Sequence, residues 1–152
     1  MDELVLRPVG YVSSAFAERE DKDWGETEAR VRLKPEFAGA LLGLEGFSHV
    51  LIVTYLHKAA YERERHLQRR PRNLETMPVV GILSQRAKNR PNPIGVTAVK
   101  VVGVGHDFLD VKGLDAIDGT PVLDIKPYYP QFDRIAEPRV PEWVDRLMVG
   151  YF

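Results

Sequence analysis

The run from Ser84 to Gly95 concentrates side chains that can bind an anionic ligand. It reads Ser-Gln-Arg-Ala-Lys-Asn-Arg-Pro-Asn-Pro-Ile-Gly, so Arg86 and Arg90 place planar cations among amide groups. Guanidinium groups bind carboxylates and phosphates through paired hydrogen bonds. Pro91 and Pro93 fix two φ angles, remove two backbone donors and bias the residue before each towards extended geometry. The run predicts a stiff segment, neither helix nor interior strand, that either binds a ligand at low entropic cost or is only a surface connection.

A second run, from Leu114 to Tyr128, brings carboxylates, an amine and a phenol close together in the sequence. The Asp118-Gly119 pair in it predicts a turn. Alternation along the strand that follows places Asp124, Lys126 and Tyr128 on one face. Groups of these three types can bind a ligand or transfer a proton. A surface cluster without a function is the alternative that the sequence leaves open.

Several other chemistries lack the residues that they require. The chain has 152 residues and no cysteine, which excludes a disulfide framework, a thiolate zinc site and a cysteine nucleophile. It contains neither a Walker phosphate loop nor a Gly-x-Ser-x-Gly nucleophile elbow. Gly103 and Gly105 lead into another strand, so they predict a hairpin turn instead of a dinucleotide site. The four histidines lack the helical spacing of a zinc site, and we expect no metal.

Charge is distributed unevenly along the chain, although the formal net charge is only -1. Residues 18–28 are mostly acidic. A basic run follows between residues 57 and 72, and its cations are Lys58, Arg63, Arg65, Arg69, Arg70 and Arg72. Such a run is typical of a surface that contacts RNA phosphates, and it is also typical of an ordinary solvated surface.

The composition is that of a globular protein, with 44% hydrophobic residues. The first ten residues lack the basic start and apolar run of a signal peptide. No apolar stretch approaches the roughly 18 residues that a membrane span requires. We therefore expect a cytoplasmic protein with no membrane association.

Hydrophobic alternation and turn residues predict a mainly β (α+β) chain. Strands are expected at 4–12, 29–33, 49–56, 79–83, 95–104, 108–113 and 121–125. A short helix is expected from Pro35 to Leu44, a helical turn and exposed loop over 58–78, and a last helix around Trp143. Short strands joined by tight turns favour a small single-sheet antiparallel β-barrel with short helices, forming one domain over residues 1–152.

Through the runs Ser84–Gly95 and Leu114–Tyr128, the sequence resembles the TsaA-like (TrmO) family. The resemblance also includes Arg7–Ser14 and Gly43–Val50, and it is strongest over Arg90–Gly95 and Leu114–Tyr128. It implies a small β-barrel that forms a homodimer and binds S-adenosylmethionine without a Rossmann site. It further implies a methyltransferase that modifies the exocyclic nitrogen of threonylcarbamoyl-adenosine in tRNA.

The resemblance also assigns site residues by matching position. The implied cofactor-binding residues are His57, Lys58, Arg86, Val96, Asp115, Ala116, Ile117 and Asp118. Arg86 could bind the carboxylate of the cofactor or a group of the RNA. The acceptor nitrogen must lose a proton, and the candidate catalytic residues are Asp118, Lys126 and Tyr128.

One segment departs from the family pattern. Better-known members carry Pro-Arg-Gln after the first strand, whereas residues 18–26 here are acidic and contain Trp24. Trp24 either stacks on the adenine of the cofactor or anchors its own loop. Two further functions therefore stay open: a non-catalytic S-adenosylmethionine-binding protein, and a methyltransferase for a different acceptor.

Overall fold

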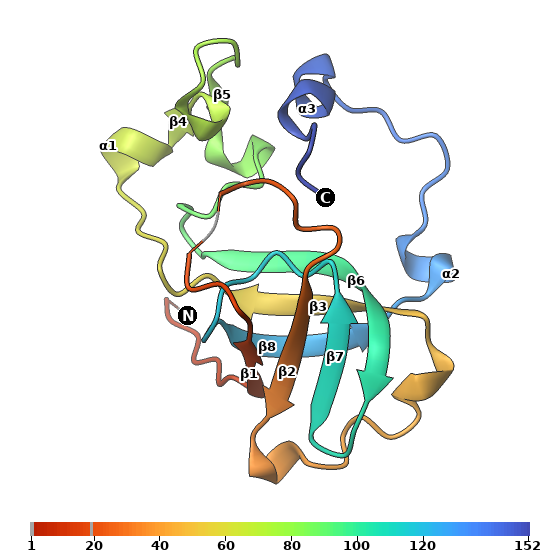
Figure 1. Ribbon diagram of the computed structural model, residues 1–152. Coiled ribbons are helices and arrows are strands. Elements are labelled where there is room, and N and C mark those ends of the chain that lie inside the picture. The colour runs from red at the N-terminus through yellow and green to blue at the C-terminus, as the bar shows by residue number, and fades with distance from the viewer. Residues whose placement is uncertain (1, 19) are drawn as a thin grey trace.

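The computed structural model describes residues 2–18 and 20–152, and a closed antiparallel barrel is its centre (Figure 1). The strands follow the order β1-β2-β7-β6-β3-β8 around the barrel. Their bounds are β1 Gly10–Ser13, β2 Glu28–Leu33, β3 His49–Tyr55, β6 Ile94–Val104, β7 Phe108–Lys112 and β8 Pro121–Pro127. The expected mainly β, single-sheet barrel is confirmed.

The barrel closes through its shortest strand, β1. Gly10 lies opposite Leu33 of β2 on one side and opposite Val122 of β8 on the other. A Cβ atom at Gly10 would lie 2.3 Å from the carbonyl oxygen of Arg32, a distance that real Cβ atoms do not reach. Glycine at this position therefore allows β1 and β2 to approach closely enough for the sheet to join its own edge.

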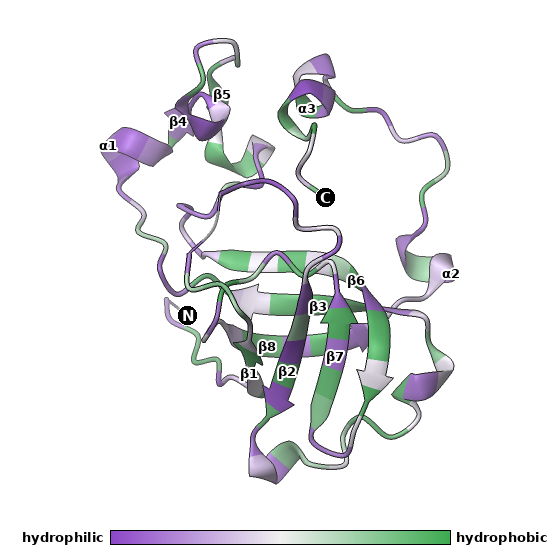
Figure 2. Cartoon of the chain, viewed as in Figure 1, coloured by the Kyte–Doolittle hydropathy of each residue, from purple (hydrophilic) through white to green (hydrophobic). Residues whose placement is uncertain are grey.

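The core fills the inside of the barrel with branched aliphatic side chains. On β3 and β7 the buried residues alternate with more exposed ones, and Val50, Ile52, Leu109 and Val111 are completely buried. Figure 2 shows the hydrophobic colouring along β3 and β6 and the hydrophilic colouring of α1 outside the barrel. Full burial of each such side chain stabilises the fold by about 1.5–3 kcal/mol.

The remaining elements lie outside the barrel. They are the 3₁₀ turns η1 Pro35–Phe37, η2 Leu44–Gly46, η3 Pro71–Asn73 and η4 Ile82–Ser84; the helices α1 Arg63–His66, α2 Pro130–Asp133 and α3 Glu142–Leu147; and the strands β4 Gln68–Arg69 and β5 Val80–Gly81. β4 and β5 pair only with each other. Figure 1 places this small sheet with α1 on one side above the barrel, and α3 on the other.

Three expectations about elements are corrected. The first strand begins at Gly10 and not at residue 4, because its register with β2 and β8 starts at Gly10, with Val9 hydrogen-bonded to Val122 and Lys34 just before it. The helix expected from residue 35 to 44 is replaced by η1 and η2, since Gly39 and Gly43 adopt φ angles of +90° and +91° between them. Residues 79–83 do not join the barrel, because the six-stranded sheet is closed and has no free edge to pair with.

Four connecting segments meet at one end of the barrel, which we call the upper rim: the described residues of 14–27 (residue 19 excepted), 56–60, 85–93 and 113–120. The backbone N–H of Leu56 donates to the carbonyl of Pro93 at 2.7 Å, and that of Gly113 donates to Thr27 at 2.9 Å. Asp118 donates its N–H to Phe16 at 2.6 Å. In Figure 1 these segments lie along the upper and left sides of the barrel. Within the described residues, no helix is both long enough and apolar enough to cross a membrane.

Candidate site at the upper rim of the barrel

The structure brings the residues implied as cofactor-binding to the upper rim. His57 and Lys58 follow β3, and Lys58 donates to the carbonyl of Ala17 at 3.4 Å. Asp115 to Asp118 lie in the connection between β7 and β8. Segments far apart in the sequence therefore meet because the barrel brings the ends of their strands together.

Arg86 and Val96 lie on the outer side of this rim. The guanidinium of Arg86 donates to the backbone carbonyl of Val96, which fixes the exposed arginine against the start of β6. The Val96 side chain points outward beside Val53 of β3 and remains 41% exposed. Arg86 keeps further N–H groups available, because a guanidinium has five donors.

The segment 85–93 is irregular and held in place by its own polar groups, as the two prolines predict. Arg90 donates to the carbonyls of Gln85 at 2.7 Å and Ala87 at 3.3 Å. Asn89 accepts a hydrogen bond from the backbone of Ala60 at 3.1 Å. Arg90 and Asn89 are therefore used to shape the segment, and Arg86 and Lys88 remain as its exposed cations.

The loop 115–118 is fixed at both ends. The carboxylate of Asp115 accepts hydrogen bonds from the hydroxyls of Thr97 and Tyr151. Asp118 accepts one from the backbone N–H of Ser14 at 2.9 Å and is exposed to solvent. The main role of Asp115 is thus to hold the loop through these two hydrogen bonds, whereas Asp118 exposes a negative charge at the rim.

The other two candidate catalytic residues lie at the opposite end of the barrel. Lys126 is five residues after the first residue of β8, or roughly 16 Å at 3.3 Å per residue. The backbone N–H of Tyr128 donates to the carbonyl of His49, at the start of β3, whereas His57 follows the end of that strand. β8 therefore separates Lys126 and Tyr128 from Asp118 along its length.

Lys126 has a local partner on β8. Its ammonium group lies 2.8 Å from the carboxylate of Asp124, so the expected shared face of these two residues is present. The hydrogen bond to Asp124 raises the pKa of Lys126 above its ordinary value. A lysine in this setting remains a cation and cannot accept a proton.

Two cations of the basic run form hydrogen bonds within the protein, although Arg70 is also exposed. Arg70 donates to the carbonyl of Met77, and Arg72 donates to the carbonyl of Leu147 at 2.9 Å. Arg63 and Arg65 on α1 are exposed, as is Lys58. The surface that can meet an RNA is therefore smaller than the sequence suggests.

Sequence reasoning missed Tyr151 and left two roles open for Trp24. Trp24 is only 4% exposed and its ring packs edge-on against Phe16, with centroids 6.2 Å apart. Its backbone N–H donates to the carbonyl of Tyr151 at 2.8 Å. Trp24 thus anchors its own loop. No local pattern marks Tyr151, because its partner Asp115 is 36 residues away in the chain.

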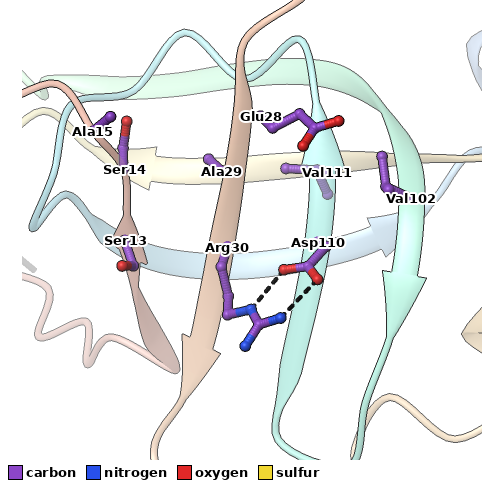
Figure 3. Close-up of a pocket in the computed structure, with 9 residues that line it drawn as sticks. All are labelled: Ser13, Ser14, Ala15, Glu28, Ala29, Arg30, Val102, Asp110 and Val111. Carbon is purple, nitrogen blue, oxygen red and sulfur yellow. Dashed lines mark hydrogen bonds and ion pairs between the residues drawn. The ribbon is translucent and has the colours of Figure 1, made fainter.

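A separate hollow of about 340 Å³ lies on the outer face of β1, β2 and β7 (Figure 3). Arg30 crosses it and binds Asp110 through two hydrogen bonds of 2.7 and 2.9 Å. The Arg30 guanidinium also lies 3.9 Å from the centroid of the Phe108 ring. Arg30 and Asp110 neutralise each other, which leaves the exposed Glu28 as the remaining charged residue that lines the hollow. Across residues 2–18 and 20–152, no three His, Asp or Glu side chains gather to hold a metal ion.

The fold and rim define a class: a small closed β-barrel domain whose candidate site lies among the loops at one end. Comparison with known proteins makes the assignment more specific. The family described as the tRNA-methyltransferase O N-terminal domain matches residues 12–134. The chain belongs to this family.

Named relatives agree with this assignment. A protein of Methanothermobacter thermautotrophicus named "Probable S-adenosyl-L-methionine-binding protein" is 39% identical over 137 residues, covering 88% of this chain and 96% of its own. The tRNA (adenine(37)-N6)-methyltransferase of Mus musculus is 34% identical over 139 residues, covering 86% of this chain and 32% of its own. The crystal structure of TrmO from Pseudomonas aeruginosa superposes with a TM-score of 0.76 at 31% identity, covering 94% of this chain and 62% of that one.

The Arg30–Asp110 pair makes stability depend on pH. The hydrogen bond from Arg30 lowers the pKa of Asp110 below its ordinary value. The pair therefore stabilises the fold above the unfolded pKa of about 4, and the contribution is lost as the pH falls through the lower folded pKa. We expect Asp110→Asn to lower the urea midpoint at pH 7, and the difference from wild type to shrink at pH 3. Asp133→Asn, at an exposed position on α2, is the control; a pH-independent difference for Asp110→Asn would contradict this account.

Proposed function

We propose that this protein is an S-adenosylmethionine-dependent methyltransferase that acts on tRNA. The observation that carries the proposal is the meeting of the two sequence runs at the upper rim. Arg86 comes from one and Asp118 from the other, and both are exposed there. Membership of the family and the names of its relatives support the same activity.

The residues at the rim fit the charges of this methyl donor. S-adenosylmethionine carries a carboxylate, an ammonium, a sulfonium and an adenosine, and supplies the methyl group when bound. Lys58 and Arg86 provide exposed cations for the carboxylate, and Asp118 provides an exposed anion. We propose that His57, Lys58, Arg86, Val96 and the loop Asp115–Asp118 form its binding site.

Positioning is the main contribution that these residues make to the reaction. Methyl transfer is an in-line displacement in which a nitrogen–carbon bond forms as the sulfur–carbon bond breaks, so orientation supplies much of the rate. The acceptor nitrogen also loses a proton. Of Asp118, Lys126 and Tyr128, we propose Asp118 as the group that accepts it, because it lies at the rim and its carboxylate is held by Ser14.

The proposed acceptor is the exocyclic nitrogen of threonylcarbamoyl-adenosine in tRNA, methylated in the cytoplasm. Exposed cations surround the rim and can contact phosphates: Lys58, Arg63, Arg65, Arg86 and Lys88. Binding through such contacts weakens steeply as the salt concentration rises. The chain spans 62% of the TrmO structure and 32% of the mouse enzyme, so the substrate of those longer proteins is carried over here as a proposal.

A homodimer is part of the proposal. The outer surface of β3 and β6 forms an apolar face that consists of Leu51, Val53, Tyr55, Ile94, Val96 and Ala98. Tyr55 and Ile94 are 43% and 39% exposed. This face is continuous with the candidate site, because Arg86 binds the carbonyl of Val96. A second copy on this face would cover its apolar atoms and close the outer side of the site.

One observation favours a second candidate function, a protein that binds S-adenosylmethionine without transferring its methyl group. The loop 14–27 lacks Pro-Arg-Gln, and its acidic part is held by internal contacts. Asp21 lies 3.5 Å from Arg72, and the N–H of Asp23 donates to the carbonyl of Gly150 at 2.8 Å.

Binding of the methyl donor is the first test. We expect calorimetry to detect S-adenosylmethionine binding, and Arg86→Ala to weaken it about tenfold to a hundredfold, since a charge-assisted hydrogen bond is lost. Arg139→Ala, at an exposed arginine away from the rim, should bind as the wild type does. Absence of binding by the wild type, with or without tRNA, would contradict both candidate functions.

Transfer of a labelled methyl group separates the two candidate functions. We expect transfer to tRNA that carries threonylcarbamoyl-adenosine and none to tRNA that lacks it. Asp118→Asn should lower kcat about a hundredfold or more, because the proton acceptor is removed, and Asp133→Asn serves as the matched control. Binding without transfer to any RNA would favour the second function. An equally large loss in Lys126→Met or Tyr128→Phe would move the catalytic role to the other end of β8.

Sedimentation velocity tests the dimer. We expect the wild type to sediment as a dimer and Ala98→Glu to shift it to a monomer, because a charge would be buried in the apolar face. Val102→Glu places the same charge on the same strand outside that face and should leave the dimer intact. A monomeric wild type at tens of micromolar would overturn this part of the proposal.

A further inference from the structure

Tyr151 connects the rim to the last part of the chain. Its hydroxyl donates to the carboxylate oxygen of Asp115 that Thr97 does not use. The side chain is partly buried, and this burial, with the nearby charge of Asp115, raises the pKa of Tyr151 well above its ordinary range. Tyr151 therefore remains a hydrogen-bond donor at every pH at which the protein would work.

The backbone around Tyr151 runs alongside the loop 14–27. Trp24 and Asp23 donate their N–H groups to the carbonyls of Tyr151 and Gly150, each at 2.8 Å. A Cβ atom on Gly25 would lie 2.6 Å from the carbonyl carbon of Phe152, so the two backbones are in close contact there. The segment 150–152 thus extends the loop that bounds one side of the rim.

Arg72 joins this segment to the small sheet outside the barrel. Its guanidinium lies 5.6 Å from the centre of the Tyr151 ring, 3.5 Å from Asp21, and donates to the carbonyl of Leu147 at 2.9 Å. Arg72 itself has a φ of +53°, an unusual angle for a residue with a side chain. Arg146 of α3 returns a hydrogen bond to the carbonyl of Thr76 at 3.1 Å. These contacts tie α3, the turn 71–77 and the loop 14–27 into one cover above the loop 115–118.

We propose that Tyr151 is a positioning residue of the S-adenosylmethionine site: its hydroxyl fixes Asp115, and with it the wall formed by residues 115–118. Residues 142–152 connect this wall to the loop 14–27. The inference rests on the proposed function for the identity of the ligand, and on the hydrogen bonds above for the role of the tyrosine.

The geometry separates positioning from direct contact. Asp115 is held by two hydroxyls, so removing one leaves the other and loosens the loop without unfolding the barrel. Ala116 is 4% exposed and packs into the barrel core, whereas Asp118 at the far end of the loop is exposed. Movement at Asp115 therefore shifts the part of the loop that faces the ligand.

The test removes only the hydroxyl, in Tyr151→Phe, with Tyr61→Phe as the matched change at a tyrosine outside the barrel. The rate of amide hydrogen exchange in the unligated protein should rise about fivefold to tenfold over residues 113–120, because one hydrogen bond is lost. The rate should stay unchanged over β3 and β6. The Kd for S-adenosylmethionine should rise by a similar factor. The KM for S-adenosylmethionine should rise by a larger factor than that by which kcat falls. Tyr61→Phe should alter neither quantity at the rim.

A double variant shows whether the effect passes through Asp115. In an Asp115→Ala background, Tyr151→Phe should add no further loss of binding, because the shared interaction is already gone. Independent, additive losses would overturn the positioning role, as would unchanged exchange over 113–120 or an unchanged Kd in Tyr151→Phe. Failure of the proposed function is distinguishable, because the wild type would then bind no S-adenosylmethionine. That result would overturn the ligand named here. The exchange measurement would still decide whether Tyr151 holds the loop.

Discussion

Closure of the barrel depends on the pairing of β1 with strands on both of its sides. β1 has only four residues, and its hydrogen bonds to β2 and β8 remove the last two free edges of the sheet. Gly10 permits this, because a side chain there would collide with the carbonyl of Arg32. A closed sheet fixes the positions of all the strand ends at once. The four connections of the upper rim therefore meet in one place, although Ser14 and Asp118, which share a hydrogen bond there, are 104 residues apart in the chain.

The rim is built in two layers. The inner layer consists of the loop 115–118 and the segment 85–93, which are fixed by Asp115 and Arg90 through hydrogen bonds to neighbouring groups. The outer layer consists of the loop 14–27, the turn 71–77 and α3, which Arg72 connects. The outer layer combines these polar contacts with a few buried apolar side chains, among them Trp24 and Met77, and lies outside the main core of the barrel.

Several charged side chains in this small protein stabilise the fold through hydrogen bonds and are therefore less available to a ligand. Arg72 and Arg90 are partly buried and satisfy backbone carbonyls of irregular segments, which secondary structure leaves without partners. Arg86 and Asp118 differ because each has one local contact and is still exposed. This difference is the physical basis for placing the proposed methyl-donor site between the two sequence runs and not along the whole basic segment.

Local patterns determined much of this architecture: alternation gave the positions of β2, β3, β6, β7 and β8, and the prolines gave the irregular backbone of residues 85–93. The residues that the family resemblance implied as cofactor-binding lie at one end of the barrel, and their role stays a prediction. Only the tertiary structure decided that β1 starts at Gly10 and that residues 79–83 stay outside the barrel, since both depend on which partners remain available. It also decided that Lys126 lies away from Asp118 and that Tyr151 binds Asp115. Such contacts follow from closure of the sheet, which brings together strand ends that no local sequence pattern relates.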